Sequence, residues 1–235
     1  MHVSKALPTF AIHPFPSDAW KTNYSPFLEE SGWQQLPVGK LRYSMGQDIL
    51  RPLPTVKFRI AYDKDAFYLL YDVKEYAVRA VAERHGDMVC QDSCVEFFFS
   101  PSEDISAGYF NLEMNCGGTA LLHYHPAKGK KVRETTASEF RSAEIRTSLP
   151  KIVDPELKGP LRWTLEARIP FKLLQKIHPF PTPEPNTVWQ GNFFKCADKT
   201  SRPHWLTWAE VDHPTPAFHI PKSFGKLEFS ANLKH

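Results

Sequence analysis

The sequence predicts an all-β fold: a single-domain β-sandwich of about ten antiparallel strands with long proline-rich loops. Short runs in which apolar and polar residues alternate recur along most of the chain, and such alternation is typical of strands with one buried face. The chain contains 21 prolines, which stand between these runs, where they interrupt no sheet hydrogen bonds. It shows no internal repeat and no long amphipathic helix pattern. Its 235 residues also suit one large all-β domain, since such domains run to about 200–250 residues.

Residues 1–54 are predicted to form an irregular N-terminal arm, and residues 55–235 the sandwich domain itself. The arm has no clear alternating run but contains the aromatic residues Trp20, Tyr24, Phe27 and Trp33. Because large aromatic side chains gain much by burial, we expect them to anchor the arm on the body, as an edge strand or as a wrapping segment.

The body begins with a predicted hairpin. Apolar residues alternate over 56–62, the charged triplet at 63–65 supplies a turn, and a second apolar run covers 67–71. One short helical turn is expected at 169–174, since proline is tolerated at the start of a helix. Four prolines within 178–185 favour an extended linker. Further strands are expected at 94–99, 109–115, 119–125, 142–148, 163–169, 188–196 and 225–229.

Composition argues against several classes of function. With 42% hydrophobic residues and a formal charge of +3, the chain is globular rather than disordered. Its basic cluster at 128–133 has no interleaved aromatic residues on which bases would stack, so we expect a solvated loop and no nucleic-acid partner. No apolar run approaches the roughly 20 residues of a membrane span. The N-terminus lacks the apolar segment of an export signal, which favours the cytoplasm, or an extracellular or periplasmic location if a leader has been removed.

The sequence offers no clear metal site. The cysteines lack the CxxC spacing of a zinc site and are expected to be reduced, buried thiols: Cys90, Cys94, Cys116 and Cys196. His123 and His125 share a strand face at a spacing that suits a metal. No third ligand is identifiable nearby, so we expect surface histidines.

Two of the predicted strands carry polar side chains that a simple core strand would lack. Glu96 lies between apolar neighbours in the first, and Asn111 and Glu113 share one face of the second. Burying a carboxylate is costly unless it is paired or hydrogen-bonded. A sheet face that offers these three residues together is therefore either well solvated or built to bind a polar ligand. Carboxylates and amides supply the hydrogen bonds that the vicinal hydroxyls of a sugar require.

Three segments, in this order, carry a resemblance to a known family. They are DSCVEFF at 92–98, YFNLE at 109–113 and FHIPKSFGKL at 218–227. Together they resemble the family 9 carbohydrate-binding modules and, more narrowly, the stand-alone family 9-like proteins, over residues 55–229. The resemblance implies a β-sandwich whose partner is a sugar or oligosaccharide, bound without turnover, in support of carbohydrate breakdown.

The resemblance also implies which side chains hold the sugar. In family 9 modules a tryptophan of the C-terminal loop stacks on the ring, and Phe218 stands at the matching position. A second family tryptophan precedes the glutamate of the D-x-x-V-E motif by six residues, and this chain has Cys90 there. Because one aromatic wall is lost, we expect Trp205 or Trp208 to close part of the site. The residues themselves call for no cofactor, whereas the resemblance allows a structural calcium ion whose ligands the sequence does not identify.

Two other classes of function stay open at this point. A glycoside hydrolase would use Glu96 and Glu113 as its catalytic pair, with carboxyls about 5–9.5 Å apart. Against this, the chain has no further domain to form a deep substrate cleft. Haem binding, found in the wider sandwich superfamily, needs axial Met or His ligands. Met114 faces away from Glu113 and Met88 falls in a loop, so they make no convincing pair.

Overall fold

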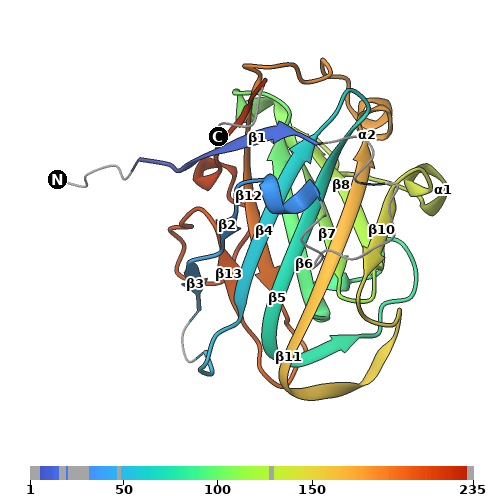
Figure 1. Cartoon of the computed structure of the whole chain (residues 1–235), viewed down its shortest axis with the longest axis vertical. Helices are drawn as coiled ribbons and strands as arrows, with labels where there is room; N and C mark the ends of the chain where they lie inside the picture. The colour runs from blue at the N-terminus through green and yellow to red at the C-terminus, as the bar shows by residue number, and fades with distance from the viewer. Residues whose placement is uncertain (1–5, 16–19, 21–31, 47–48, 127–129, 232–235) are drawn as a thin grey trace.

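Two β-sheets pack face to face in the computed structural model, which describes residues 6–15, 20, 32–46, 49–126 and 130–231 (Figure 1). The first sheet contains β10 (Glu144–Thr147), β11 (Val153–Pro170), β5 (Ala66–Ala80), β4 (Thr55–Tyr62) and β2 (Gly39–Lys40). The second contains β14 (Gly225–Phe229), β12 (Val188–Cys196), β6 (Cys94–Ser100), β7 (Gly108–Asn115), β8 (Ala120–Pro126), β9 (Arg133–Glu134), β13 (Trp205–Thr207) and β3 (Tyr43–Met45). The helices are short: α1 (Ala137–Phe140), α2 (Phe171–Ile177), η1 (Gly32–Gln35), η2 (Val89–Gln91), η3 (Ile105–Ala107) and η4 (Pro221–Ser223). The all-β sandwich that the sequence predicts is confirmed.

Strand β1 (Thr9–Pro14) joins the two sheets. Residues 9–12 pair in parallel with β14, and residues 13–14 pair in parallel with β4. Among the described residues the other strand pairings are all antiparallel, so β1 departs from the antiparallel arrangement that the sequence predicts. This strand lies between two others and not at an edge, although it belongs to the predicted irregular arm. Its run is too short, and too close to prolines, to stand out by alternation.

Aromatic side chains fill the space between the sheets. Phe58 of the first sheet stacks on Phe193 of the second with ring centroids 3.8 Å apart, and Phe193 stacks on Phe97 at 4.6 Å. The inward residues of β6 and β7 complete this core, which leaves their alternate residues on the outer face of the second sheet: Cys94, Glu96, Phe98, Tyr109, Asn111 and Glu113. The pleat therefore directs the polar residues singled out in the sequence away from the core.

A buried ion pair also crosses between the sheets. The Nζ of Lys195, on β12, lies 3.0 Å from a carboxylate oxygen of Glu75, on β5, and both side chains are almost wholly inaccessible to solvent. The indole of Trp163 donates a 2.7 Å hydrogen bond to the other oxygen of Glu75. His204 lies 2.9 Å from the Lys195 ammonium. Lys195 is therefore a charged residue on the inward face of β12, and the other face of this strand lies on the outer side of the second sheet.

Aromatic residues of the predicted arm cover the outer face of the first sheet. Trp20 and Trp33 pack with Phe15 against Tyr68 and Leu70 of β5. Their indole N–H groups are satisfied by carboxylates of the same sheet, Glu144 and Glu166. Tyr24 and Phe27, which the sequence also suggests as anchors, lie outside the described residues.

The strands β4, β6, β7, β8, β12 and β14 lie within a few residues of their predicted bounds, but β5 and β11 are much longer, at 15 and 18 residues. β11 passes through two irregularities in its pairing with β5, between Val153 and Leu157 and between Lys158 and Leu161. These irregularities interrupt the alternation of apolar and polar residues from which the strand at 163–169 is predicted, so its full length is not visible in the sequence. The helical turn expected at 169–174 is α2, and the proline-rich stretch at 178–185 forms no regular element.

The aspartate of the D-x-x-V-E motif has a structural role. Asp92 is buried, and its carboxylate accepts hydrogen bonds from the backbone N–H groups of Val81 and Ala82, from Arg79 and from Asn115. These bonds tie the chain that follows β5 to the start of β6 and the end of β7. Asp92 therefore fixes the strands that present Glu96 and Glu113.

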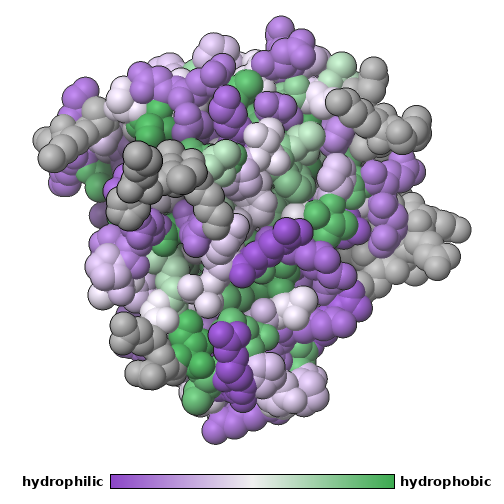
Figure 2. Space-filling view, turned by 90° about the vertical axis from the view of Figure 1, so that its left-hand side faces the viewer, coloured by the Kyte–Doolittle hydropathy of each residue, from purple (hydrophilic) through white to green (hydrophobic). Residues whose placement is uncertain are grey.

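The face that carries β2, β3 and β13 is largely hydrophilic, with hydrophobic residues gathered at its centre and lower half (Figure 2). No described helix has the length and apolarity needed to cross a membrane. In the basic cluster, residues 130–133 are exposed, while 128–129 lie outside the described residues.

Candidate functional site

A pocket of about 360 Å³ opens on the outer face of the second sheet. Its floor is formed by Glu96 of β6 and by Asn111 and Glu113 of β7. Its sides are formed by residues of η2, β8, β12, β13 and the connecting loops, among them Cys90, His123, His125, Cys196, Asp198, Trp205, Phe218 and His219. Strands from the middle of the chain and loops from its C-terminal quarter therefore build one concave site.

The two glutamates of the floor stand directly opposite each other in the register of β6 and β7. Glu96 is 2% exposed and Glu113 is 8% exposed. The Cys196 thiol donates to Glu96 at 2.9 Å, and the Asn111 amide donates to Glu113 at 2.8 Å. From the first sheet, the Tyr71 hydroxyl donates to the backbone carbonyl of Glu96 at 2.7 Å and fixes β6 from behind. The floor thus contains two adjacent carboxyls, each with one side-chain hydrogen-bond donor among the described residues.

Burial sets the protonation of this floor. Desolvation raises the pKa of Glu113 to about 7. Desolvation, with the charge of Glu113 added, raises the pKa of Glu96 well above its ordinary value. Two carboxyls this close do not readily ionise together. At neutral pH the pair therefore keeps a proton, so that together the two carboxyls can both donate and accept hydrogen bonds.

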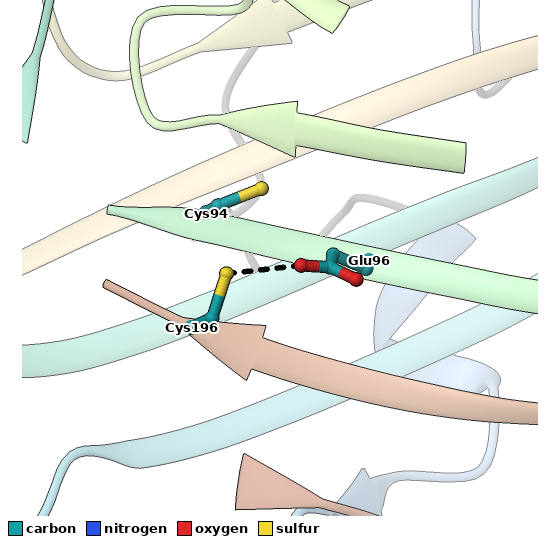
Figure 3. Close-up of side chains that lie close together, drawn as sticks. All are labelled: Cys94, Glu96 and Cys196. Carbon is teal, nitrogen blue, oxygen red and sulfur yellow. Dashed lines mark hydrogen bonds between the residues drawn. The ribbon is translucent and has the colours of Figure 1, made fainter. Parts of the chain in front are cut away.

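A thiol pair adjoins the floor (Figure 3). Cys94 and Glu96 come from β6 and Cys196 from β12. The two Sγ atoms and a carboxylate oxygen of Glu96 all lie within 4.8 Å of one another. Burial raises the pKa of Cys94 to about 12 and that of Cys196 well above its ordinary value, so both thiols are protonated at neutral pH. The Cys196 S–H group donates to Glu96. We describe the trio as a hydrogen-bonded support of the floor and assign no metal to it.

Aromatic side chains form the walls. Phe218 stacks on Phe194 with centroids 4.2 Å apart and an interplanar angle of 17°, which leaves its other side toward the pocket. Trp205 is held by a 2.8 Å hydrogen bond from its indole N–H to Asp198. Both rings are partly exposed. An aromatic ring fixed in this way offers a flat apolar surface to the C–H face of a sugar.

A network of histidines lines the opposite side. The His125 ring stacks on Tyr109 at 4.8 Å, and its Nε2–H donates to the side-chain oxygen of Asn111 at 2.9 Å. The Tyr109 hydroxyl lies 2.8 Å from Nδ1 of His219. Burial lowers the pKa of His125 to about 4, and burial also lowers the pKa of His123 and His219. The lowered pKa values favour the neutral form of all three rings, and His125 holds Asn111 in position.

Five of the six predicted site residues meet in this pocket: Glu96, Asn111, Glu113, Trp205 and Phe218. Trp208 does not. Its ring is 9% exposed and packs edge-on against Phe58 and Phe193 in the core. An offset of three along extended chain places Trp205 and Trp208 on opposite faces, so only one of them reaches the pocket. The role of the five residues in binding stays a prediction.

Asp198 has no predicted role, and Cys196 is predicted only as a buried thiol. His123 and His125 are predicted as surface histidines, and that prediction is wrong. Cys90 lines the pocket, where the family resemblance implies a tryptophan. Cys196 ends β12 and Asp198 lies just beyond it, and the pairing of β12 with β6 brings both residues to the pocket that Glu96 lines. His123 and His125 line the pocket rather than an open surface. Their alternation along β8 with the buried Leu122 and Tyr124 was the available signal.

The haem alternative and the calcium ion that the family resemblance allows can be compared with these residues. The methionines of the haem alternative lie on opposite faces of the second sheet, Met114 in the core and Met88 at the pocket. Calcium takes six to eight oxygen ligands. Among the described residues, the cluster of side chains that could bind a metal is Cys94, Glu96 and Cys196, and its one carboxylate and two thiols do not suit calcium. The structural calcium therefore stays a prediction.

Comparison with known proteins decides the family. The model of carbohydrate-binding family 9 matches residues 37–229, which is most of the chain. The chain belongs to carbohydrate-binding family 9.

Solved structures agree with this membership. A proposed carbohydrate-binding protein from Bacteroides uniformis is 29% identical, with a TM-score of 0.83, and the match covers 94% of this chain and 99% of that one. Two structures of a family 9 module from Caldicellulosiruptor kristjanssonii share the fold. The glucose complex is 13% identical with a TM-score of 0.64, covering 97% and 98% of the two chains. The cellotriose complex is 14% identical with a TM-score of 0.62, covering 96% and 95%. No curated protein matches the chain.

The buried floor of this family 9 protein should make its stability depend on pH. The pKa of Glu113 is about 7 in the folded state and near its ordinary 4.5 when unfolded, so the folded state binds more protons between these values. The free energy of unfolding that this group contributes is therefore expected to fall as the pH rises from about 4.5 to 7. Urea unfolding at several pH values across this window, compared between the wild type and Glu113→Gln, measures it.

We expect Glu113→Gln to gain stability over the wild type as the pH rises, because glutamine has no proton to lose. Glu184→Gln, an exposed glutamate outside the pocket, is the matched control and should follow the wild type. Parallel curves for Glu113→Gln and the wild type would show that the floor is solvated and that its carboxyls ionise normally.

Proposed function

We propose that this protein binds a mono- or oligosaccharide in the pocket on the second sheet and does not cleave it. The observation that carries the proposal is the combination, in one pocket, of a carboxyl and amide floor with two fixed aromatic faces. Sugars are recognised by this pairing of planar hydrogen bonds with an apolar ring face. Membership of family 9, and the glucose and cellotriose complexes of a module with the same fold, support it.

The size of the site favours a small ligand. A volume of about 360 Å³ is at the lower end of the range of about 300–1,000 Å³ that ligand pockets span. One or two sugar rings suit such a pocket better than a long chain lying across it. Because Cys90 stands where the family resemblance implies a tryptophan, we expect modest affinity, with binding free energies of about −4 to −6 kcal/mol. Isothermal titration calorimetry with a panel of monosaccharides and disaccharides tests the proposal, and the absence of binding to all of them would reject it.

The aromatic wall gives a second test. Replacing Phe218 by alanine should weaken binding by about 0.5–1.5 kcal/mol, because the ring stacks on Phe194 and offers its free side to the ligand. Phe218→Trp should bind at least as tightly as the wild type. Tyr76→Ala, which removes an exposed aromatic ring outside the pocket, is the control. Equal affinities for Phe218→Ala and Tyr76→Ala would remove Phe218 from the ligand-contacting surface.

The hydrolase alternative has a direct test. Glu96 and Glu113 are adjacent, but both are hydrogen-bonded parts of a buried floor, and burial raises the pKa of both carboxyls, whereas a hydrolase also needs a carboxylate that is readily ionised. Purified protein is therefore expected to release no reducing sugar from the glycans that it binds. Turnover that Glu96→Gln abolishes would overturn the binding proposal in favour of catalysis.

A further inference from the structure

The pocket has an unbalanced set of charged groups. Three acidic side chains line it, Glu96, Glu113 and Asp198, while its described lining contains no lysine and no arginine. Lys195 is not part of this lining, because it points between the sheets and is held there by Glu75, and its charge acts on Glu96 and Asp198 only as a minor influence from behind the floor. The site therefore presents carboxyl groups to a ligand with no protein cation beside them.

The histidines around the pocket do not supply the missing charge. His125 has its pKa lowered to about 4, and the pKa values of His123 and His219 are lowered as well, in each case chiefly by burial. His125 is therefore a neutral hydrogen-bonding ring at pH 6 to 7, and the lowered pKa values of His123 and His219 favour their neutral forms. The remaining titratable groups of the lining are the thiols of Cys90 and Cys196, which burial keeps protonated.

The carboxyls also have hydrogen-bonding capacity left over. Within the part of the chain that the structure describes, hydrogen bonds reach one oxygen of Glu96, from Cys196, and one oxygen of Glu113, from Asn111. The second oxygen of each receives none from these residues, although both side chains are more than nine-tenths buried and line the pocket. A buried carboxyl in this state calls for a donor, and the strongest donor is a cationic one.

We propose that the preferred ligand of this pocket is an amino sugar, a hexose whose protonated amino group is bound by Glu96 and Glu113. An ammonium group carries three N–H donors and a positive charge, so it satisfies the free oxygens of both carboxyls at once and removes the repulsion between them. The rest of the ring is neutral and stacks on Phe218 or Trp205. This inference rests on the proposed function, because it names the class of sugar that the same pocket takes.

The test compares matched pairs of sugars by calorimetry at pH 6, where the amine is protonated. The pairs are glucose with glucosamine, galactose with galactosamine and mannose with mannosamine, and the N-acetyl form of each amine serves as a neutral control of similar size. In the pair that binds best, we expect the amine to bind at least tenfold more tightly than both neutral forms. Because the ammonium favours ionised carboxyls, binding should also release protons, so that the measured enthalpy varies with the ionisation enthalpy of the buffer.

Two variants locate the effect. Glu113→Gln removes one negative charge at nearly constant shape and should bring the ratio of amine to neutral affinity toward one. Glu184→Gln, outside the pocket, should leave the ratio unchanged. If neutral sugars bind as tightly as their amines, and no protons are released, the preference is overturned while the proposed function stands. If no sugar of either kind binds, the proposed function itself fails.

Discussion

Replacing Glu75 by alanine is expected to destabilise the folded protein by about 3–5 kcal/mol, the cost of leaving a buried charge without its partner. Lys195 is fully buried between the sheets, 3.0 Å from the Glu75 carboxylate. Its other partners are neutral: the carbonyl of Cys196 and the ring of His204, each 2.9 Å away. Without Glu75 the ammonium would either remain unpaired in the core or have to lose its proton.

His204 does not take over the role of the lost carboxylate, because it offers Lys195 a neutral acceptor and no negative charge. Its Nδ1–H donates to the carbonyl of Arg202 at 2.8 Å, which leaves Nε2 to accept from Lys195. Burial and the neighbouring Lys195 charge lower the pKa of His204 to about 2, so the ring stays neutral. Glu75→Ala also leaves the Trp163 indole N–H, which donates to Glu75 at 2.7 Å, without its acceptor. The loss of the ion pair and the loss of this hydrogen bond both lower the free energy of unfolding.

Urea unfolding of Glu75→Ala, Lys195→Met and the double variant Glu75→Ala/Lys195→Met measures this effect. The double variant should lose much less stability than the sum of the single variants, because it removes both charges together. Additive losses would mean that the two charges are solvated separately and do not depend on each other.

Much of the fold is predictable from the sequence because most of its strands alternate cleanly. β6 and β7 are found within one residue of their predicted bounds, and the side-chain alternation places Glu96, Asn111 and Glu113 on the outer face. β1 escapes prediction because its parallel pairing with β14 and β4 joins segments that are distant in the sequence. The parts of β5 and β11 that extend beyond the predicted bounds are not predicted, because irregular pairing there interrupts the two-residue alternation of side chains.

The candidate site is predictable to the extent that it lies on single strands. The floor follows from two adjacent segments, but the walls depend on how loops fold back over the sheet. Asp198 matters because it holds Trp205, and Cys196 because β12 pairs with β6, and neither contact has a local signature. Whether Trp205 or Trp208 reaches the pocket depends on which face of the segment 205–208 meets the core. Gly225 helps to settle it, because a side chain there would collide with the Trp208 ring at 2.6 Å.

Replacing Glu113 by alanine is expected to weaken ligand binding by about 1–3 kcal/mol, a loss of roughly 5- to 150-fold in affinity. Glu113 stands at the centre of the floor, opposite Glu96 and bonded to Asn111, and it keeps one oxygen for the ligand. Alanine would leave the ligand group that bonds to this oxygen unpaired in a buried site, which is the costly case for a hydrogen bond. The Asn111 amide would lose its acceptor at the same time.

The loss of affinity can be separated from a loss of folding. Burial raises the pKa of Glu113 to about 7, so the ionised side chain is itself unfavourable in the folded state near neutral pH. Its removal should therefore leave the protein folded, with a free energy of unfolding at pH 7.5 close to that of the wild type. Calorimetry with the best ligand, together with urea unfolding of the same sample, measures both quantities. Glu96→Ala and Asn111→Ala should weaken binding as well, and Glu184→Ala should not. Unchanged affinity in all three floor variants would place the ligand on another surface, because each of them removes a polar group that this pocket requires.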